Sequence, residues 1–170
     1  MRVQSIVQFV PDMTQGGFKI LSPATGQVDQ IASLPGANHI FNSVGEGVLI
    51  KLEGQTVCSP INGKVIEYIP SLGKVIVQAK NKMRFLLQLS FQHVNLHGLG
   101  IKSNIVTGQL VEVGQPLFQL DLYKIKLHLK PVVLYFLLLD HKQFKAIEVI
   151  RRQVELAKDP IFTLLPNQAK

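Results

Sequence analysis

The chain has 170 residues, of which 46% are hydrophobic and only 17% charged, and its formal net charge is +7. This length suits one domain with a full core, and the composition excludes a disordered chain. A single cysteine excludes an internal disulfide and fits a reducing compartment. No basic run is interleaved with aromatic residues, so we expect no nucleic-acid binding and attribute the positive charge mainly to solubility.

The N-terminal stretch MRVQSIVQFVPDM contains only a short apolar segment, which Pro11 interrupts. It is too short for the apolar region of a secretory signal. The longest apolar run, Val132–Leu139, has eight residues, whereas a membrane-spanning helix needs about 20. We therefore expect a cytoplasmic protein without stable insertion into a membrane.

Most of the chain is predicted to form short strands. Segments rich in branched and aromatic residues are separated by turn signals, as strands require. In chain order, these segments are VIVQA (75–79), FLLQL (85–89), LFQLDL (117–122), VVLYF (132–136) and IFTLL (161–165).

The segment KIKLHLK (124–130) alternates polar and apolar residues. As a strand it would present a cationic stripe able to meet an anion, formed by Lys124, Lys126, His128 and Lys130. Lysines also protect exposed edge strands against aggregation, and we favour that structural explanation over a binding role.

A helix is predicted from Asp140 to about Leu156. Asp140 is a candidate N-cap with Gln143 three residues later, as in a capping box. Apolar residues then recur at helical spacing at Phe144, Ile147, Ile150 and Val154, and Asp159-Pro160 would end the segment.

Two pairs of similar segments indicate a duplicated unit. SPATGQV (22–28) and SPINGKV (59–65) share the pattern SPxxGxV, which suits a tight turn entering a strand. VGEGVLI (44–50) also resembles VGQPLFQL (113–120). We therefore expect an all-β fold: an antiparallel β-sandwich of two interlocked similar units, of the barrel-sandwich type, with one C-terminal helix.

The order of these motifs resembles the glucose-type enzyme IIA component of the phosphoenolpyruvate:sugar phosphotransferase system. SPxxGxV, VGEGVLIK, SPINGKV, LHGLGIK and EVGQPLFQLDL follow one another as the family's corresponding turns and strands do, without a gap from Ser22 to Leu122. The resemblance extends over about residues 18–165 and implies one enzyme IIA-like domain over 1–170.

Family members relay a phosphoryl group. The resemblance implies that a histidine accepts the group from a histidine phosphocarrier protein and passes it to a sugar permease, while a second histidine supports it. The ungapped register places Gln88 at the accepting position and Gly73 at the supporting position, within Ser71-Leu72-Gly73. An amide nitrogen is not nucleophilic, and glycine has no side chain, so neither residue can take over the chemistry.

The surface that docks the partners is altered as well. The family's acidic residues that receive an arginine of the phosphocarrier correspond to Gly36 and Gln92, and the resemblance defines a docking face around them. Its other members in this chain are Asn38, His39, Val44, Ile69, Ser71, Ile76, Leu86 and Val94.

Other chemistries find less support. Zinc peptidases of related architecture would place a ligand histidine at Gln88, and catalytic zinc needs three protein ligands, so we keep a degenerate peptidase-like domain only as a remote alternative. His93 and His97 lie in a Gly-rich turn, where two surface histidines are a better interpretation than a metal site. No modified-lysine tripeptide of a biotin or lipoyl carrier is present. Cys58 is interpreted as a buried apolar residue, because no partner histidine lies at a recognisable spacing.

The sequence thus predicts an enzyme IIA homologue that does not accept phosphate and acts as a binding or regulatory protein. We expect no metal and no cofactor. The expected partner is a protein: a permease, a metabolic enzyme or another component of the phosphotransferase system. The alternative is an active phosphocarrier in sugar transport that uses a different acceptor residue, such as His93 or His97.

Overall fold

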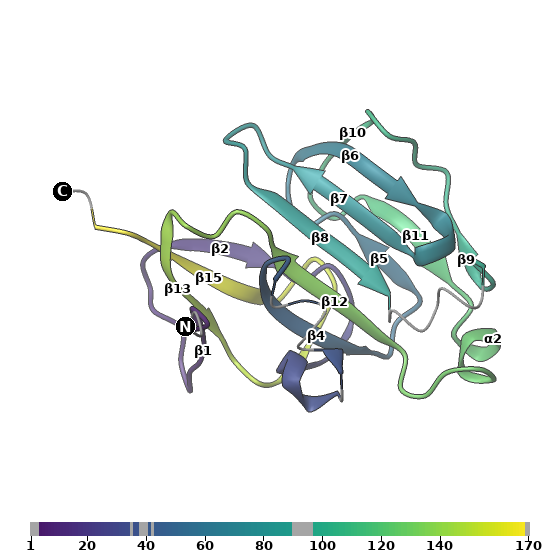
Figure 1. Ribbon diagram of the computed structural model, residues 1–170, viewed down its shortest axis with the longest axis horizontal. Helices are drawn as coiled ribbons and strands as arrows, with labels where there is room; N and C mark the ends of the chain where they lie inside the picture. Colours follow the sequence, from purple (N-terminus) through teal and green to yellow (C-terminus); the bar gives the residue numbers. More distant parts are fainter. Residues whose placement is uncertain (1–3, 35, 38–40, 42, 90–96, 169–170) are drawn as a thin grey trace.

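Short strands rich in valine, isoleucine, leucine and phenylalanine form three sheets in the computed structural model, which describes residues 4–34, 36, 37, 41, 43–89 and 97–168 (Figure 1). Neighbouring strands pair antiparallel throughout, except that the first strand pairs parallel with β13 (Phe144–Val149). The predicted β-sandwich is confirmed, and the strands expected at 75–79, 85–89, 117–122, 132–136 and 161–165 are all present, with ends that differ by at most two residues.

The largest sheet has eight strands. Its central strand, β12, is buried along its whole length, as expected for a strand covered on both faces. In spatial order, the sheet consists of β10 (Leu110–Val111), β6 (Gly63–Ile69), β7 (Lys74–Gln78), β8 (Arg84–Leu89), β12 (Val133–Leu138), β4 (Glu46–Leu52), β3 (Gly26–Asp29) and β14 (Gln153–Val154).

Two smaller sheets complete the fold. The four-stranded sheet consists of β1 (Val7–Phe9), β13, β15 (Pro160–Pro166) and β2 (Phe18–Leu21). The three-stranded sheet consists of β5 (Thr56–Cys58), β11 (Pro116–Leu120) and β9 (Ile101–Lys102). The main hydrophobic core combines side chains from all three sheets. Within it, Phe136 of β12 stacks on Phe85 and on Phe162 of β15, with ring centroids 5.4 and 4.8 Å apart.

A second, smaller core covers the opposite face of the eight-stranded sheet. It contains Leu86, Tyr135 and Leu137 of the sheet together with Ile31 and Phe41 from the segment that precedes β4. Successive residues of a strand point to opposite faces, so each central strand contributes alternate side chains to the two cores. The two cores therefore lie on the two faces of one sheet, and the candidate site is on the face that carries the smaller core.

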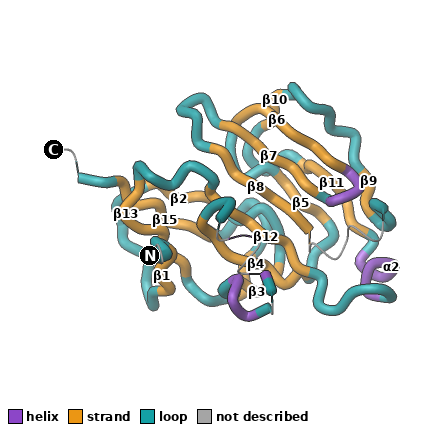
Figure 2. Tube along the Cα trace, viewed as in Figure 1, coloured by secondary structure: helices purple, strands orange, loops and turns teal. Residues whose placement is uncertain are grey.

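Helical structure among the described residues is limited to short pieces at the periphery (Figure 2): η1 (Ile31–Ser33), η2 (Pro70–Leu72) and α2 (Leu122–Lys126), together with the helical residues Ala37 and Phe41. None of the described helices is long and apolar enough to cross a membrane. α2 corrects the strand considered for 124–130. The Asp121 side chain accepts a hydrogen bond from the Lys124 amide at 3.1 Å, and this N-cap starts a helical turn that the alternation of residue types did not indicate.

The helix predicted from Asp140 to Leu156 is wrong. Residues 144–149 form strand β13 and residues 153–154 form β14. Five of the six β13 residues are buried, because β1 and β15 flank the strand and the main core lies beneath it. Asp140 does not cap a helix: its carboxylate pairs with the Arg84 guanidinium at 2.7 and 3.0 Å.

The duplication is present, but one pairing of its segments was wrong. Ser22 and Ser59 make the same bond, each hydroxyl donating at 2.6 Å to the carbonyl two residues later. The Gly114 amide donates to the Ser59 carbonyl at 2.9 Å, and its counterpart is Ala157, which donates to the Ser22 carbonyl at 2.8 Å. The turn at 111–116 therefore corresponds to that at 154–160, whereas the Gly45 amide donates to Phe41 in a different arrangement.

Candidate functional site

The two positions that the sequence singled out lie on adjacent strands. Gln88 of β8 pairs with Lys74 of β7, and the Leu89 amide donates a hydrogen bond to the Gly73 carbonyl at 3.2 Å. The predicted proximity of Gln88 and Gly73 is thus confirmed. The predicted alternation along β8 is confirmed as well, because Phe85, Leu87 and Leu89 enter the main core while Leu86 enters the smaller one.

Gln88 stands in a row of side chains that crosses the outer face of the sheet. Residues directly opposite each other in an antiparallel pair point to the same face. Gln88 lies opposite Lys74 on one side and Tyr135 on the other, and the row continues from Lys74 to Ile69 and from Tyr135 to Leu49. We call Ile69, Lys74, Gln88, Tyr135 and Leu49 the acceptor row.

The two charged or polar neighbours of Gln88 are not free nucleophiles. Lys74 Nζ lies 2.8 Å from a carboxylate oxygen of Glu67, its neighbour on β6. Tyr135 is fully buried and stacks on Phe41 with ring centroids 4.1 Å apart. Burial raises the pKa of the Tyr135 hydroxyl, and this hydroxyl has no hydrogen-bond partner among the described residues.

Gly73 is adapted to having no side chain. Its φ of +58° lies in the left-handed region, which glycine adopts without strain. A β-carbon there would lie 2.7 Å from Leu89 Cδ1 and 2.9 Å from Leu89 Cγ. Leu89, which is buried in the main core, thus fills the space into which a side chain at position 73 would extend.

The docking face is only partly a surface. Val44 is 45% exposed, Gly36 and Ser71 are exposed, and Ile69 and Ile76 are half-buried. Leu86 is 2% exposed, because it packs in the smaller core between Ile76 and Leu137. Asn38, His39, Gln92, Val94 and His93 lie outside the described residues.

His97 is the described histidine that the chain brings toward this region. It has a φ of +50° and begins the turn that leads into β9. A β-carbon on the next residue, Gly98, would lie 3.4 Å from the Pro70 carbonyl oxygen, so this turn packs against η2 beside Gly73. Within the described part of the chain, no three His, Cys, Asp or Glu residues cluster as a metal site would require.

Cys58 has the environment that the sequence predicted. It is fully buried, and burial raises the pKa of its thiol to about 11. A thiol with that pKa is almost entirely protonated at neutral pH and is a poor nucleophile.

Sequence reasoning missed three neighbours of the two singled-out positions: Lys74, Leu89 and Tyr135. The position of Lys74 beside the site could have been predicted from the sequence. Lys74 follows Gly73 directly and begins the strand that pairs with the one carrying Gln88. Tyr135 could not have been placed, because the partner of a central strand cannot be read from a continuous apolar run.

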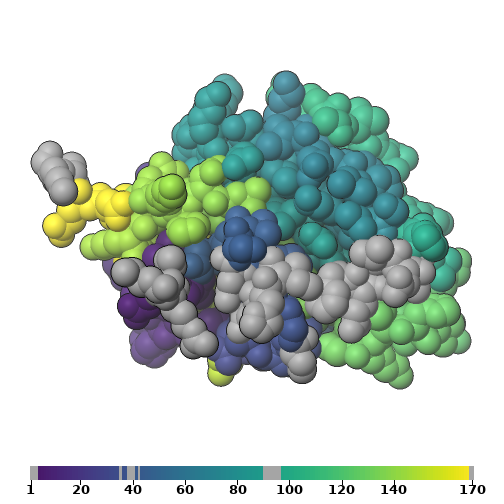
Figure 3. Space-filling model, viewed as in Figure 1, coloured from purple at the N-terminus to yellow at the C-terminus, as the bar shows by residue number. Residues whose placement is uncertain are grey.

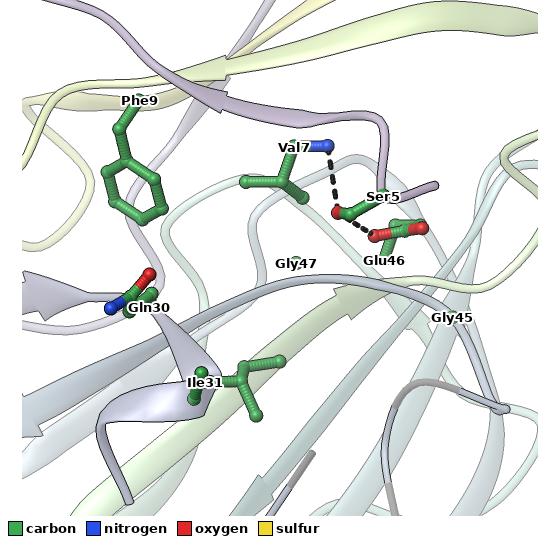
Figure 4. A pocket seen from close by; sticks show the side chains of 9 residues that line it. Ser5, Val7, Phe9, Gln30, Ile31, Gly45, Glu46 and Gly47 are labelled. Atoms are coloured by element: carbon green, nitrogen blue, oxygen red, sulfur yellow. Dashed lines mark hydrogen bonds between the residues drawn. The ribbon is translucent and has the colours of Figure 1, made fainter. Parts of the chain in front are cut away.

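Other hollows lie away from the acceptor row. One of about 270 Å³ lies between β1 and β4, where the Ser5 hydroxyl donates to Glu46 at 2.7 Å and accepts from the Val7 amide at 3.2 Å (Figure 4). A more open one of about 530 Å³ lies between the β7–β8 and β12–β13 hairpins, and the Arg84–Asp140 pair borders it. Neither contains Gln88 or Gly73.

Comparison with known proteins decides the family. The family model described as "phosphoenolpyruvate-dependent sugar phosphotransferase system, EIIA 1" matches residues 18–144. The chain belongs to this family. The resemblance predicted from the SPxxGxV and VGxx turns is therefore confirmed as membership of the EIIA 1 family.

Curated relatives of this EIIA 1 protein carry matching names. It is 29% identical over 107 residues to the "PTS system glucose-specific EIIA component" of Oceanobacillus iheyensis, which covers 63% of this chain and 65% of the relative. It is 28% identical over 131 residues to the component of that name from Staphylococcus epidermidis, covering 77% of this chain and 79% of the relative. The match to the "PTS system glucoside-specific EIICBA component" of Staphylococcus carnosus is 28% identical and spans only 17% of that longer protein.

A solved structure supports the fold of the EIIA 1 chain. The glucose permease IIA of Mycoplasma capricolum superimposes with a TM-score of 0.75, covering 87% of this chain and 96% of that one at 20% identity. At that identity the likeness concerns the arrangement of the strands alone.

Proposed function

We propose that this EIIA 1 protein does not accept phosphate and works in the cytoplasm by binding a protein partner of the sugar phosphotransferase system through its outer sheet face. The whole chain, 1–170, would act as one EIIA-like unit. The observation that carries this proposal is the acceptor row, in which Gln88, at the position that the resemblance assigns to the accepting histidine, stands between Lys74 and Tyr135.

The chemistry of phosphoryl transfer supports the first part. Transfer needs a nucleophile held about 3–3.5 Å from the phosphorus atom and in line with the leaving group. The lone pair of the Gln88 amide nitrogen is delocalised into its carbonyl. Lys74 is paired with Glu67, and the Tyr135 hydroxyl is buried, so neither neighbour in the row offers a substitute.

The rebuilt neighbourhood of Gly73 supports the second part. Gly73 has a left-handed backbone, and the Leu89 side chain fills the space into which the second imidazole implied by the resemblance would extend. If the histidines alone had been replaced, without repacking, the space for that imidazole ring would remain. On the outer face Val44 is exposed and Ile69 and Ile76 are half-buried, and their apolar atoms can contact a partner without any transfer step.

The first experiment is reconstitution of the relay. We expect incubation with phosphoenolpyruvate, enzyme I and the histidine phosphocarrier protein to leave the chain unmodified by intact mass spectrometry at alkaline pH, where phosphohistidine persists. An EIIA protein that has both histidines serves as the positive control. Stoichiometric phosphate that maps to His93 or His97, and disappears in the corresponding alanine variant, would establish the active-carrier alternative instead.

A variant separates lost chemistry from lost docking. Gln88→His places an imidazole in the row without disturbing Gly73. Phosphate gained by this variant would show that the phosphocarrier still docks and that only the acceptor is missing. If the variant stays unmodified, either the missing supporting side chain at Gly73 or the altered docking positions Gly36, Asn38, His39 and Gln92 form a second barrier to transfer.

A further inference from the structure

The lysine-rich segment that follows β11 presents apolar side chains to solvent. Tyr123 is 77% exposed and Leu127 is 67% exposed, which places both among the most exposed large hydrophobic residues of the described chain. They lie four residues apart, Tyr123 within α2 and Leu127 at its C-cap. Residues at this spacing lie on one side of a helix, so the two side chains form a single apolar tip.

The tip is held firmly against the protein. Leu122 and Ile125, on the inner side of α2, are buried in the main core. The Asp121 carbonyl accepts from the Ile125 amide at 3.1 Å, and the Asp121 amide donates to Gly100 at 2.7 Å. Gly100 leaves room for Ile125, since a β-carbon on it would lie 2.8 Å from Ile125 Cγ1. The exposure of Tyr123 is therefore fixed by the anchoring of the opposite side.

Positive charge surrounds this tip. Lys124, Lys126 and Lys130 are exposed, and Lys102 lines the same shallow hollow as Lys124. Asp121 is the one carboxylate between residues 121 and 130. It lies 4.0 Å from Lys124 with both side chains exposed, so it offsets little of the positive potential.

We propose that α2 and the residues up to Lys130 bind the surface of an anionic membrane, with Tyr123 and Leu127 in the headgroup region and the lysines over acidic headgroups. Tyrosine favours this zone because its ring is apolar and its hydroxyl remains hydrated. The positive charge of clustered lysines attracts anionic lipid headgroups. Membrane contact of this kind is peripheral and reversible.

The shape of the tip favours a membrane over an acidic protein. α2 lies at the edge of the molecule, in green at the lower right of Figure 1, and the same green segment is at the lower right of the surface in Figure 3. Tyr123 and Leu127 are its exposed apolar side chains. A protein partner would have to supply a matching pocket and paired charges, whereas a lipid headgroup layer deforms around a projection. From residue 122 to residue 130 the charged side chains are lysines, without a carboxylate. This single sign of charge suits a layer of anionic headgroups.

Membrane binding through α2 would also orient the candidate site. The turn at Gly98–Gly100 connects the two regions: Gly100 contacts Ile125, and Gly98 lies against Pro70 of η2, next to Gly73. The end of the acceptor row thus lies on the α2 side of the molecule. This inference does not depend on whether Gln88 accepts phosphate.

The chain contains no tryptophan, so a single introduced tryptophan reports its own surroundings. We expect the Tyr123→Trp variant to show a blue-shifted emission with phosphatidylglycerol-containing vesicles and none with phosphatidylcholine vesicles. Leu110→Trp is the matched control, because Leu110 is 76% exposed but lies in β10, at the far edge of the eight-stranded sheet. It should show no shift with either vesicle.

Sedimentation with the same phosphatidylglycerol vesicles measures the partition coefficient of each variant between membrane and solution. Lys124→Gln and Lys126→Gln should each lower the partition coefficient of the full chain about fivefold. Tyr123→Ser with Leu127→Ser should lower it about tenfold, while Leu110→Ser leaves it unchanged. Circular dichroism checks that each variant is folded.

Three results would overturn the proposal. One is the absence of any shift in Tyr123→Trp with the anionic vesicles. A second is an equal shift in Leu110→Trp. The third is a shift in Tyr123→Trp that soluble polyglutamate reproduces in full, because that would assign the segment to an acidic protein rather than to lipid.

Discussion

Gly73 shows how a single residue at the candidate site depends on a contact with a distant part of the sequence. The resemblance assigned it to the position of a supporting histidine, and in the structure it precedes Lys74, which pairs with Gln88. What the sequence could not show is that Leu89, sixteen positions later, occupies the space beside it. This contact depends on the twist and register of two strands, and only the folded chain brings the residues together.

Gly73→Ala tests this packing. We expect it to lower the free energy of unfolding by about 2–4 kcal/mol, because the new methyl group adds a clash with Leu89 to the strain of a left-handed backbone. Gly36→Ala is the control: its φ is +82°, but a β-carbon there meets no atom of the described residues within 4 Å, so only about 1 kcal/mol of strain is expected. Urea denaturation measures both values, and equal losses would show that Leu89 moves aside without cost.

At the scale of elements, the sequence predicted strands well where residue types and turns agreed, and failed where periodicities competed. The apolar residues of 144–154 fit helical spacing, yet FKAIEV forms β13. A strand buried on both faces loses its alternation, so its apolar pattern can mimic a helix by chance. The strand considered for KIKLHLK was wrong in the opposite direction. Its residues alternate as in a strand, but the segment begins within the helical turn that Asp121 caps.

The duplicated SPxxG turns were predicted correctly because their chemistry is local. Ser22 and Ser59 are both fully buried, and each hydroxyl bonds within its own turn. The correspondence of the 111–116 and 154–160 turns escaped sequence comparison because Ala157 adopts a φ of +56° where its counterpart is Gly114. A glycine there would have made the second copy easier to detect.

Equal bonds in the two copies predict equal energetic effects. Ser22→Ala and Ser59→Ala should each lower the free energy of unfolding by about 1–3 kcal/mol, because each leaves a buried carbonyl without its donor. Ser71→Ala, on the exposed end of η2, should change it by less than about 0.5 kcal/mol. Thermal or urea unfolding of the three variants would contradict the duplicated role if only one of the buried serines mattered.

At the scale of the whole molecule, the eight-stranded sheet separates two cores of different thickness. The main core is enclosed by the two smaller sheets, whereas among the described residues the smaller core is closed by η1, Ala37 and Phe41. Stability is not uniform across such a structure, and a thin cover opens at lower free energy than the ladder beneath it. The face that carries Gln88 is therefore the side of the molecule on which local opening is expected.

Phe41→Ala should release this cover without unfolding the sheet. Phe41 stacks on Tyr135, and its carbonyl accepts from the Val44 and Gly45 amides at 3.0 and 3.1 Å. We expect hydrogen exchange at these two amides to accelerate, while amides of the β8–β12–β4 ladder keep their protection. Phe85→Ala provides the contrast, because the Phe85 ring stacks on Phe136 in the main core. Its loss should cost about 3–5 kcal/mol globally and speed exchange throughout the ladder. Were Phe41→Ala to deprotect β12 as strongly as Phe85→Ala does, the two cores would be one cooperative unit, and the outer face would have no independent freedom to open toward a partner.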